Sequence, residues 1–60
     1  MPSREILFEY VQAGNSIRVT AIDADSGKEV TIQVPLATSQ ADMQRAALRK
    51  LEYVMRKPKK

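Results

Sequence analysis

The sequence predicts an α+β fold, in which a three-stranded antiparallel meander is followed by one C-terminal α-helix packed on one face of the sheet. Two alternating apolar stretches flank Gly14-Asn15, and a third stretch follows the turn sequence Ala24-Asp25-Ser26-Gly27. From Gln40 onward, apolar residues recur with the spacing of a helix. A chain of 60 residues is long enough for one domain, which we expect to span residues 1–60.

The first two strands are expected at about residues 5–12 and 16–23, where apolar and polar residues alternate and β-branched and aromatic types are common. The Gly14-Asn15 pair between them is typical of a tight hairpin. A hairpin closed at this pair places apolar residues opposite one another, as a correct register should. The opposed pairs are then Tyr10–Val19, Phe8–Ala21 and Leu7–Ile22.

The third strand is expected at about residues 28–34. Gly27 can adopt the positive φ that closes the preceding turn. Placing Asp23 opposite Lys28 again brings apolar residues together across the strands. Pro35 should end the strand, because it has no N–H to donate. The opposed pairs are Ala21–Val30, Val19–Ile32 and Ile17–Val34.

The helix is expected at about residues 40–57, followed by a basic tail at 58–60 that begins with Pro58. Ser39 is the expected N-cap and Thr38 the alternative. Asp42 stands three residues after Ser39, as in a short-armed capping box, and its charge suits a helix N-terminus. The apolar residues of the segment cover about 160° of the helix circumference. They are Ala41, Met43, Ala47, Leu48, Leu51, Val54 and Met55.

The two faces of the predicted sheet differ in character. The face expected beneath the helix is apolar, and its members are Ile6, Phe8, Tyr10, Ile17, Val19, Ala21, Val30, Ile32 and Val34. The other face carries Leu7, Val11 and Ile22 among polar residues. These three form a candidate dimer surface or a contact surface for another protein, although scattered surface apolar residues are also normal. A chain this short buries only about 60% of its unfolded surface, and without cysteine it has no disulfide to add, so we expect a homodimer.

Basic residues concentrate at the C-terminal end. Residues 1–44 carry three basic and six acidic residues, whereas residues 45–60 carry seven basic residues and only Glu52 as an acid. A tyrosine flanked by lysines suits stacking of bases and contact with phosphates of single-stranded nucleic acid. The alternatives are packing of the tyrosine at an interface and local ion pairs, namely Asp42–Arg45, Arg49–Glu52 and Glu52–Arg56. The candidate anion or nucleic-acid surface comprises Arg45, Arg49, Lys50, Tyr53, Arg56 and Lys57.

Several functions are made improbable by what the sequence lacks. It has no cysteine, which would supply a thiol nucleophile, and no histidine, which is the commonest general base and metal ligand. The stretch Asp23-Ala24-Asp25-Ser26-Gly27 resembles the start of a calcium loop, but Gly27 is its fifth residue and Val34 its twelfth, so the ligand spacing fails. We expect no enzyme activity and no catalytic, cofactor-binding or metal site.

The expected location is the cytoplasm, with no membrane association. No run of about 18 apolar residues is present to span a bilayer. The N-terminal stretch MPSREILFEYVQ carries Glu5 and Glu9 where a signal peptide would be apolar.

Three stretches carry a family resemblance: EILFEYVQAGNSIRV at residues 5–19, VTAIDADSGKEVTI at 19–32 and RAALRKLEYVMRK at 45–57. Together they resemble a family of very short bacterial proteins classed as a domain of unknown function. The resemblance covers roughly residues 5–57, implies a bacterial cytoplasmic setting and assigns no site residue. That family tends to have a Gly-Pro step after the third strand, whereas this chain reads Gln33-Val34-Pro35-Leu36, so this turn is expected to differ.

The sequence therefore predicts a non-catalytic, homodimeric interaction module that binds another macromolecule, with Leu7, Val11 and Ile22 in the interface. The alternative is an RNA- or ribosome-associated protein that binds nucleic acid through its basic helix. Phosphate contacts weaken steeply as salt rises, so salt dependence separates the two hypotheses.

Overall fold

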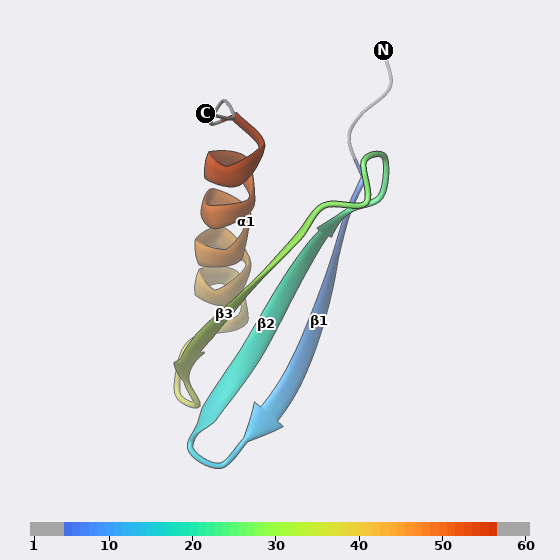
Figure 1. The fold of residues 1–60 in the computed structure, drawn as a ribbon. Coiled ribbons are helices and arrows are strands. Elements are labelled where there is room, and N and C mark those ends of the chain that lie inside the picture. Colours follow the sequence, from blue (N-terminus) through green and yellow to red (C-terminus); the bar gives the residue numbers. More distant parts are fainter. Residues whose placement is uncertain (1–4, 57–60) are drawn as a thin grey trace.

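The computed structural model describes residues 5–56, which form three strands followed by one helix (Figure 1). The strands form one sheet in the order β1-β2-β3, and each neighbouring pair is antiparallel. The helix contacts this sheet, so the predicted α+β fold is confirmed. The elements are β1 (Ile6–Ala13), β2 (Ser16–Asp23), β3 (Glu29–Pro35) and α1 (Gln40–Arg56).

Both strand registers agree with those predicted from the sequence. In the first hairpin, Gly14 has a φ of 63° and Asn15 has no positive φ, which is the glycine placement of a type II′ turn. In the second, Gly27 has a φ of 81° and its N–H donates to the carbonyl of Asp23 over 2.8 Å. The N–H of Asp23 in turn donates to the carbonyl of Lys28 over 2.8 Å. The turn residues thus fix which side chains meet across the sheet.

The carboxylate of Asp23 holds the second turn together. The residue is only 1% exposed, and its Oδ2 accepts a 2.8 Å hydrogen bond from the hydroxyl of Ser26. Its Oδ1 accepts a longer bond of 3.4 Å from the N–H of Asp25. A buried polar group needs such partners, so the acidic residues around Gly27 are explained by turn geometry.

The ends of two strands differ from the predicted bounds by one residue. β1 runs from Ile6 to Ala13 rather than from residue 5 to 12, and β3 runs from Glu29 to Pro35 rather than from 28 to 34. Pro35 is tolerated because its missing N–H faces away from β2 in the alternating ladder. The pairing continues past it, since the N–H of Leu36 donates to the carbonyl of Asn15 over 2.9 Å.

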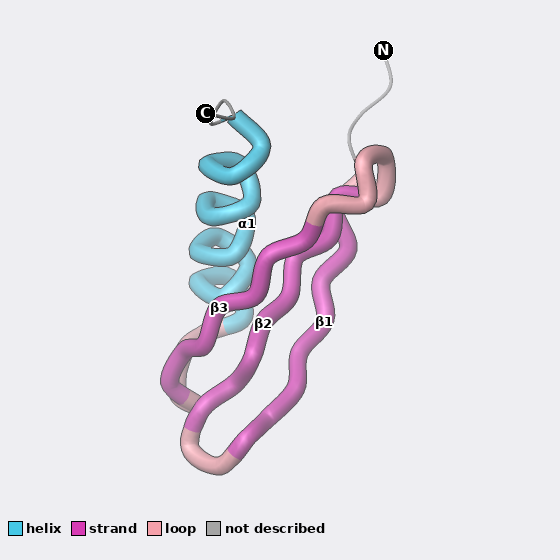
Figure 2. Tube along the Cα trace, in the orientation of Figure 1, coloured by secondary structure: helices cyan, strands magenta, loops and turns pink. Residues whose placement is uncertain are grey.

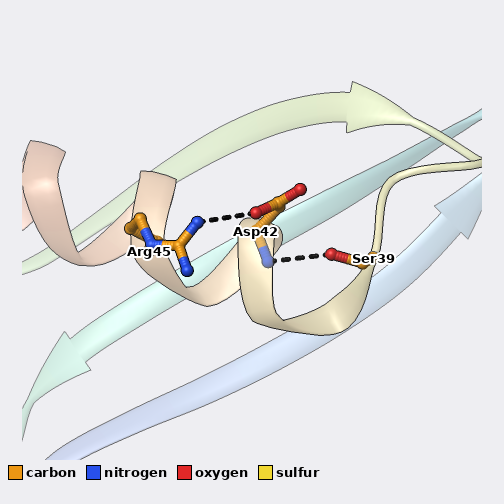
Figure 3. Close-up of polar contacts among 3 residues, drawn as sticks. All are labelled: Ser39, Asp42 and Arg45. Atoms are coloured by element: carbon orange, nitrogen blue, oxygen red, sulfur yellow. Dashed lines mark hydrogen bonds and ion pairs between the residues drawn. The ribbon is translucent and has the colours of Figure 1, made fainter.

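Ser39 caps α1, as predicted (Figure 3). Its hydroxyl oxygen accepts a 3.1 Å hydrogen bond from the N–H of Asp42, and its carbonyl accepts one of 2.9 Å from the N–H of Met43. The carboxylate of Asp42 does not complete a capping box, because it turns to Arg45 and binds Nη1 at 2.7 Å. The predicted end of the helix at Lys57 and Pro58 and the basic tail at 58–60 lie outside the described residues.

The core lies between α1 and the β2–β3 half of the sheet. In Figure 2, α1 is on the β3 side and β1 forms the opposite edge, and the helix contacts are with β2 and β3. Ile6 and Phe8 of β1 are half-buried against this core, but Tyr10, expected beneath the helix, is 38% exposed. The buried apolar residues are Val19, Ala21, Val30, Met43, Ala47 and Leu51.

Two residues that the sequence pattern assigns to the apolar faces, Tyr10 and Val54, lie outside this core. The hydroxyl of Tyr10 accepts a 2.8 Å hydrogen bond from Nε2 of Gln44, so the ring stands at the margin between β1 and α1. Val54, part of the predicted apolar arc, is 41% exposed. The helix therefore buries a narrower stripe than its sequence predicts, because its main contacts are with two of the three strands.

Replacing Ser39 with alanine should destabilise the fold by about 1 kcal/mol, because the N–H of Asp42 loses its cap. Ser39→Asn is the matched control, since asparagine caps helices as well as serine does, and it should stay close to wild type. Urea unfolding followed by circular dichroism measures both. Equal stability of Ser39→Ala and wild type would show that the cap contributes nothing.

Candidate interaction surfaces

The sheet face opposite α1, called the open face below, carries mixed polar and apolar side chains, and its exposed large apolar side chains lie on β1. Leu7 and Val11 are 47% and 55% exposed, and Glu9 lies between them on the same face. Ile22 pairs directly with Leu7 across the strands but is only half-buried rather than fully exposed. The three predicted interface residues therefore share one face, where Leu7 and Ile22 adjoin and Val11 stands apart.

The β2–β3 half of the open face is held by polar contacts. The hydroxyls of Thr20 and Thr31 are 3.1 Å apart and hydrogen-bonded. Nε2 of Gln33 donates to the hydroxyl of Ser16 over 2.7 Å. These side chains satisfy one another across the strands, so the exposed apolar area of this face gathers on β1.

The basic surface of α1, defined by its six predicted residues, is engaged only in part. Arg45 is paired with Asp42 at 2.7 Å, as expected. Nζ of Lys50 lies 3.4 Å from the carbonyl oxygen of Thr31 and so reaches over β3. Tyr53 is 60% exposed. The predicted position Lys57 lies outside the described residues.

The expected ion pairs of Glu52 are not formed. Arg49 and Arg56 make no ion pair with any residue between 5 and 56. All three side chains lie on the exposed side of α1, where an ion pair gains only about 0.2–0.5 kcal/mol and must hold two flexible side chains in place. The prediction that Glu52 neutralises both arginines was wrong, and these two cations face solvent.

The outer edge of β1 follows from its hydrogen bonding to β2. The N–H of Ala24 donates to the carbonyl of Glu5 over 3.0 Å, and bonded and non-bonded pairs alternate along an antiparallel ladder. The odd-numbered residues of β1 therefore face β2. The even-numbered residues direct their N–H and C=O groups outward, and these are Ile6, Phe8, Tyr10 and Gln12.

The two edges of the sheet are protected differently. On β3, the outward carbonyl of Thr31 receives the ammonium of Lys50, and the outward position Pro35 has no N–H. β1 has neither a lysine nor a proline, and no described side chain bonds to its outward backbone groups. Lysine and proline are devices that prevent strand addition at an edge, so within residues 5–56 the edge of β3 is protected and that of β1 is not.

Sequence reasoning missed this edge. The Gly14-Asn15 turn fixes which residues of β1 point outward, so their identity was already available from the predicted hairpin. What the sequence did not reveal was that α1 would lie toward β3, because that depends on packing between elements. Without it, the protection of one edge and not the other could not be predicted.

No helix within residues 5–56 combines the length and the apolar content needed to cross a bilayer. Neither a curated protein nor a solved structure matches the chain. A family model described as "Domain of unknown function (DUF6898)" matches residues 3–58. Because this match covers nearly the whole sequence, the chain belongs to the DUF6898 family.

Proposed function

We propose that the protein is a non-catalytic interaction module that works as a homodimer and binds another macromolecule. Its proposed contact surface is centred on β1, where Leu7 and Val11 form the central part and Ile22 of β2 the periphery. The observation that carries this proposal is the exposure of Leu7 and Val11, at 47% and 55%, on the sheet face opposite α1.

Two further features support a protein contact at β1. Tyr10 on the helix side of the same strand is 38% exposed, so apolar surface is available on both faces of β1. The core of the described residues is also small, and its buried apolar residues all come from β2, β3 and α1. Small domains without disulfides commonly gain stability by association, and covering β1 would extend this core.

The double variant Leu7→Thr/Val11→Thr should weaken self-association at least about tenfold, because each copy loses apolar contact area, and tenfold corresponds to about 1.4 kcal/mol. Light scattering on a size-exclusion column gives the mass over a range of protein concentrations. The wild type should be dimeric at both about 50 mM and about 500 mM salt, because salt screens interactions between charges and an apolar interface does not rely on them.

The matched control is Leu36→Thr/Val54→Thr, which makes the same changes at positions that are 44% and 41% exposed elsewhere on the molecule. It should keep the wild-type mass. A wild type that remains monomeric at every concentration contradicts the homodimer, and equal weakening by both double variants contradicts the placement on β1.

A second candidate function, binding of single-stranded nucleic acid through α1, is favoured by the freedom of Arg49 and Arg56. Their side chains form no ion pair within residues 5–56, and Tyr53 on the same helix is 60% exposed. Exposed cations beside an aromatic ring suit contact with phosphates and bases. Arg45, held by Asp42 at 2.7 Å, is less available for this role.

If α1 binds single strands, Arg49→Gln should weaken binding of a fluorescent oligouridine and lower the slope of log K against log salt by about 0.7, the value for one lost phosphate contact. Arg45→Gln removes the same charge from a residue already paired with Asp42, so it should change the slope less. Fluorescence anisotropy at several salt concentrations measures both. Equal losses would indicate general charge attraction and contradict a specific role for Arg49.

A further inference from the structure

We propose that two copies of the chain associate edge to edge, through antiparallel pairing of their β1 strands with Phe8 opposite Phe8 of the second copy. The two sheets then form one continuous sheet, with β1 and its counterpart at the centre. This inference rests on the proposed homodimer and specifies its geometry, because stacking of the two open faces would give a homodimer of a different kind.

The free edge of β1 is the first reason for this arrangement (Figure 1). Its outward N–H and C=O groups belong to Ile6, Phe8, Tyr10 and Gln12, and no described side chain bonds to them. At the β3 edge, pairing with another strand is hindered by Lys50, which binds the carbonyl of Thr31, and by Pro35, which has no N–H. Strand addition is therefore favoured at one edge only, which gives a closed dimer rather than a growing chain.

The pattern of side chains selects the register. Outward-facing backbone groups must meet outward-facing ones, so even-numbered residues pair with even-numbered residues of the second copy. With Phe8 at the twofold axis, Ile6 lies opposite Tyr10 of the second copy, and a row of apolar side chains forms on the helix side. On the open face, Leu7 lies opposite Glu9 of the second copy and can pack against the methylene groups of its side chain.

One competing register is centred one residue further along, on Glu9. It would place Glu9 directly opposite Glu9 of the second copy, and like charges in directly opposed positions are destabilising. It would also place Ile6 opposite Gln12 of the second copy rather than opposite an aromatic ring. The charge of Glu9 therefore acts against this register and in favour of the one centred on Phe8.

The resulting seam has about six backbone hydrogen bonds, two from each bonded pair. A twofold axis perpendicular to the sheet keeps both helices on the same face. The half-buried side chains of Ile6 and Phe8 and the ring of Tyr10 then gain neighbours from the second copy, on the strand that α1 covers least. The pairing thus covers the apolar surface that one copy leaves exposed.

Replacing Tyr10 with proline tests the pairing directly. Its N–H points outward, so proline removes no backbone hydrogen bond within the monomer but breaks the pair with Ile6 of the second copy. The expected result is a monomer by light scattering at a concentration where the wild type is dimeric. Tyr10→Phe controls for the hydroxyl that Gln44 binds, and Gln33→Pro makes the same change at an outward position of β3; both should remain dimeric.

Circular dichroism must show that Tyr10→Pro keeps the wild-type secondary structure. A folded Tyr10→Pro that remains dimeric overturns the edge pairing. The result also separates this inference from the proposed function, since a face-to-face dimer would survive Tyr10→Pro and be lost in Leu7→Thr/Val11→Thr. A monomeric wild type would defeat both.

Cysteine cross-linking tests the register without disturbing the backbone. The chain has no cysteine, and Leu7 and Glu9 of the second copy form a non-bonded pair with Cα atoms about 4.5 Å apart, close enough for a disulfide. Leu7→Cys mixed with Glu9→Cys should give a mixed disulfide dimer under oxidised glutathione, whereas each variant alone should cross-link poorly, because its two copies are then diagonal neighbours about 7–8 Å apart.

A non-reducing gel and the intact mass identify the products. Cross-linking of Glu9→Cys with itself, at the rate of the mixture or faster, overturns the Phe8 register and indicates the one centred on Glu9. Absence of any cross-link in the mixture, while light scattering still shows a dimer, overturns the pairing centred on Phe8. Thr31→Cys on β3 serves as the control for random collision and should remain uncross-linked.

Discussion

The packing of α1 on only two of the three strands is the constraint on which the other features of the molecule depend. Ala21 of β2 and Ala47 of α1 are both fully buried, and such small side chains let a helix and a sheet approach closely. Leu51 and Val19, also fully buried, complete the contact. Because the close approach occurs over β2 and β3, β1 is held in the sheet by its hairpin with β2 and contributes no fully buried side chain.

The fold and its registers could be predicted because they depend on local chemistry. Gly14 and Gly27 both adopt the positive φ that their turns require, and each turn fixes the pairing of its strands. Ser39 caps α1 through its hydroxyl. Within the fold, the differences are at strand ends and at Asp42. Its exposed carboxylate binds the guanidinium of Arg45 instead of the N–H of Ser39 that a capping box would use.

The surfaces were harder to predict because they depend on where one element lies relative to another. Tyr10 occupies a position in the alternating pattern of β1 that predicts burial beneath the helix. It is nevertheless 38% exposed, because α1 is shifted toward β3. The same shift carries Lys50 to the carbonyl of Thr31. Ion pairing of Glu52 was predicted from spacing alone, and spacing does not include the entropy cost of ordering exposed side chains.

The position of α1 also makes the two proposed activities compatible, namely self-association through β1 and binding of nucleic acid through α1. Arg49 and Arg56 project from the side of the helix that faces solvent, whereas the unprotected strand edge lies beyond β2 on the far side of the sheet from β3. Pairing of β1 strands would leave both arginines exposed and place the helices of two copies on one face. A nucleic-acid strand would then meet two basic helices rather than one, and linking two weak sites raises overall affinity without any new contact.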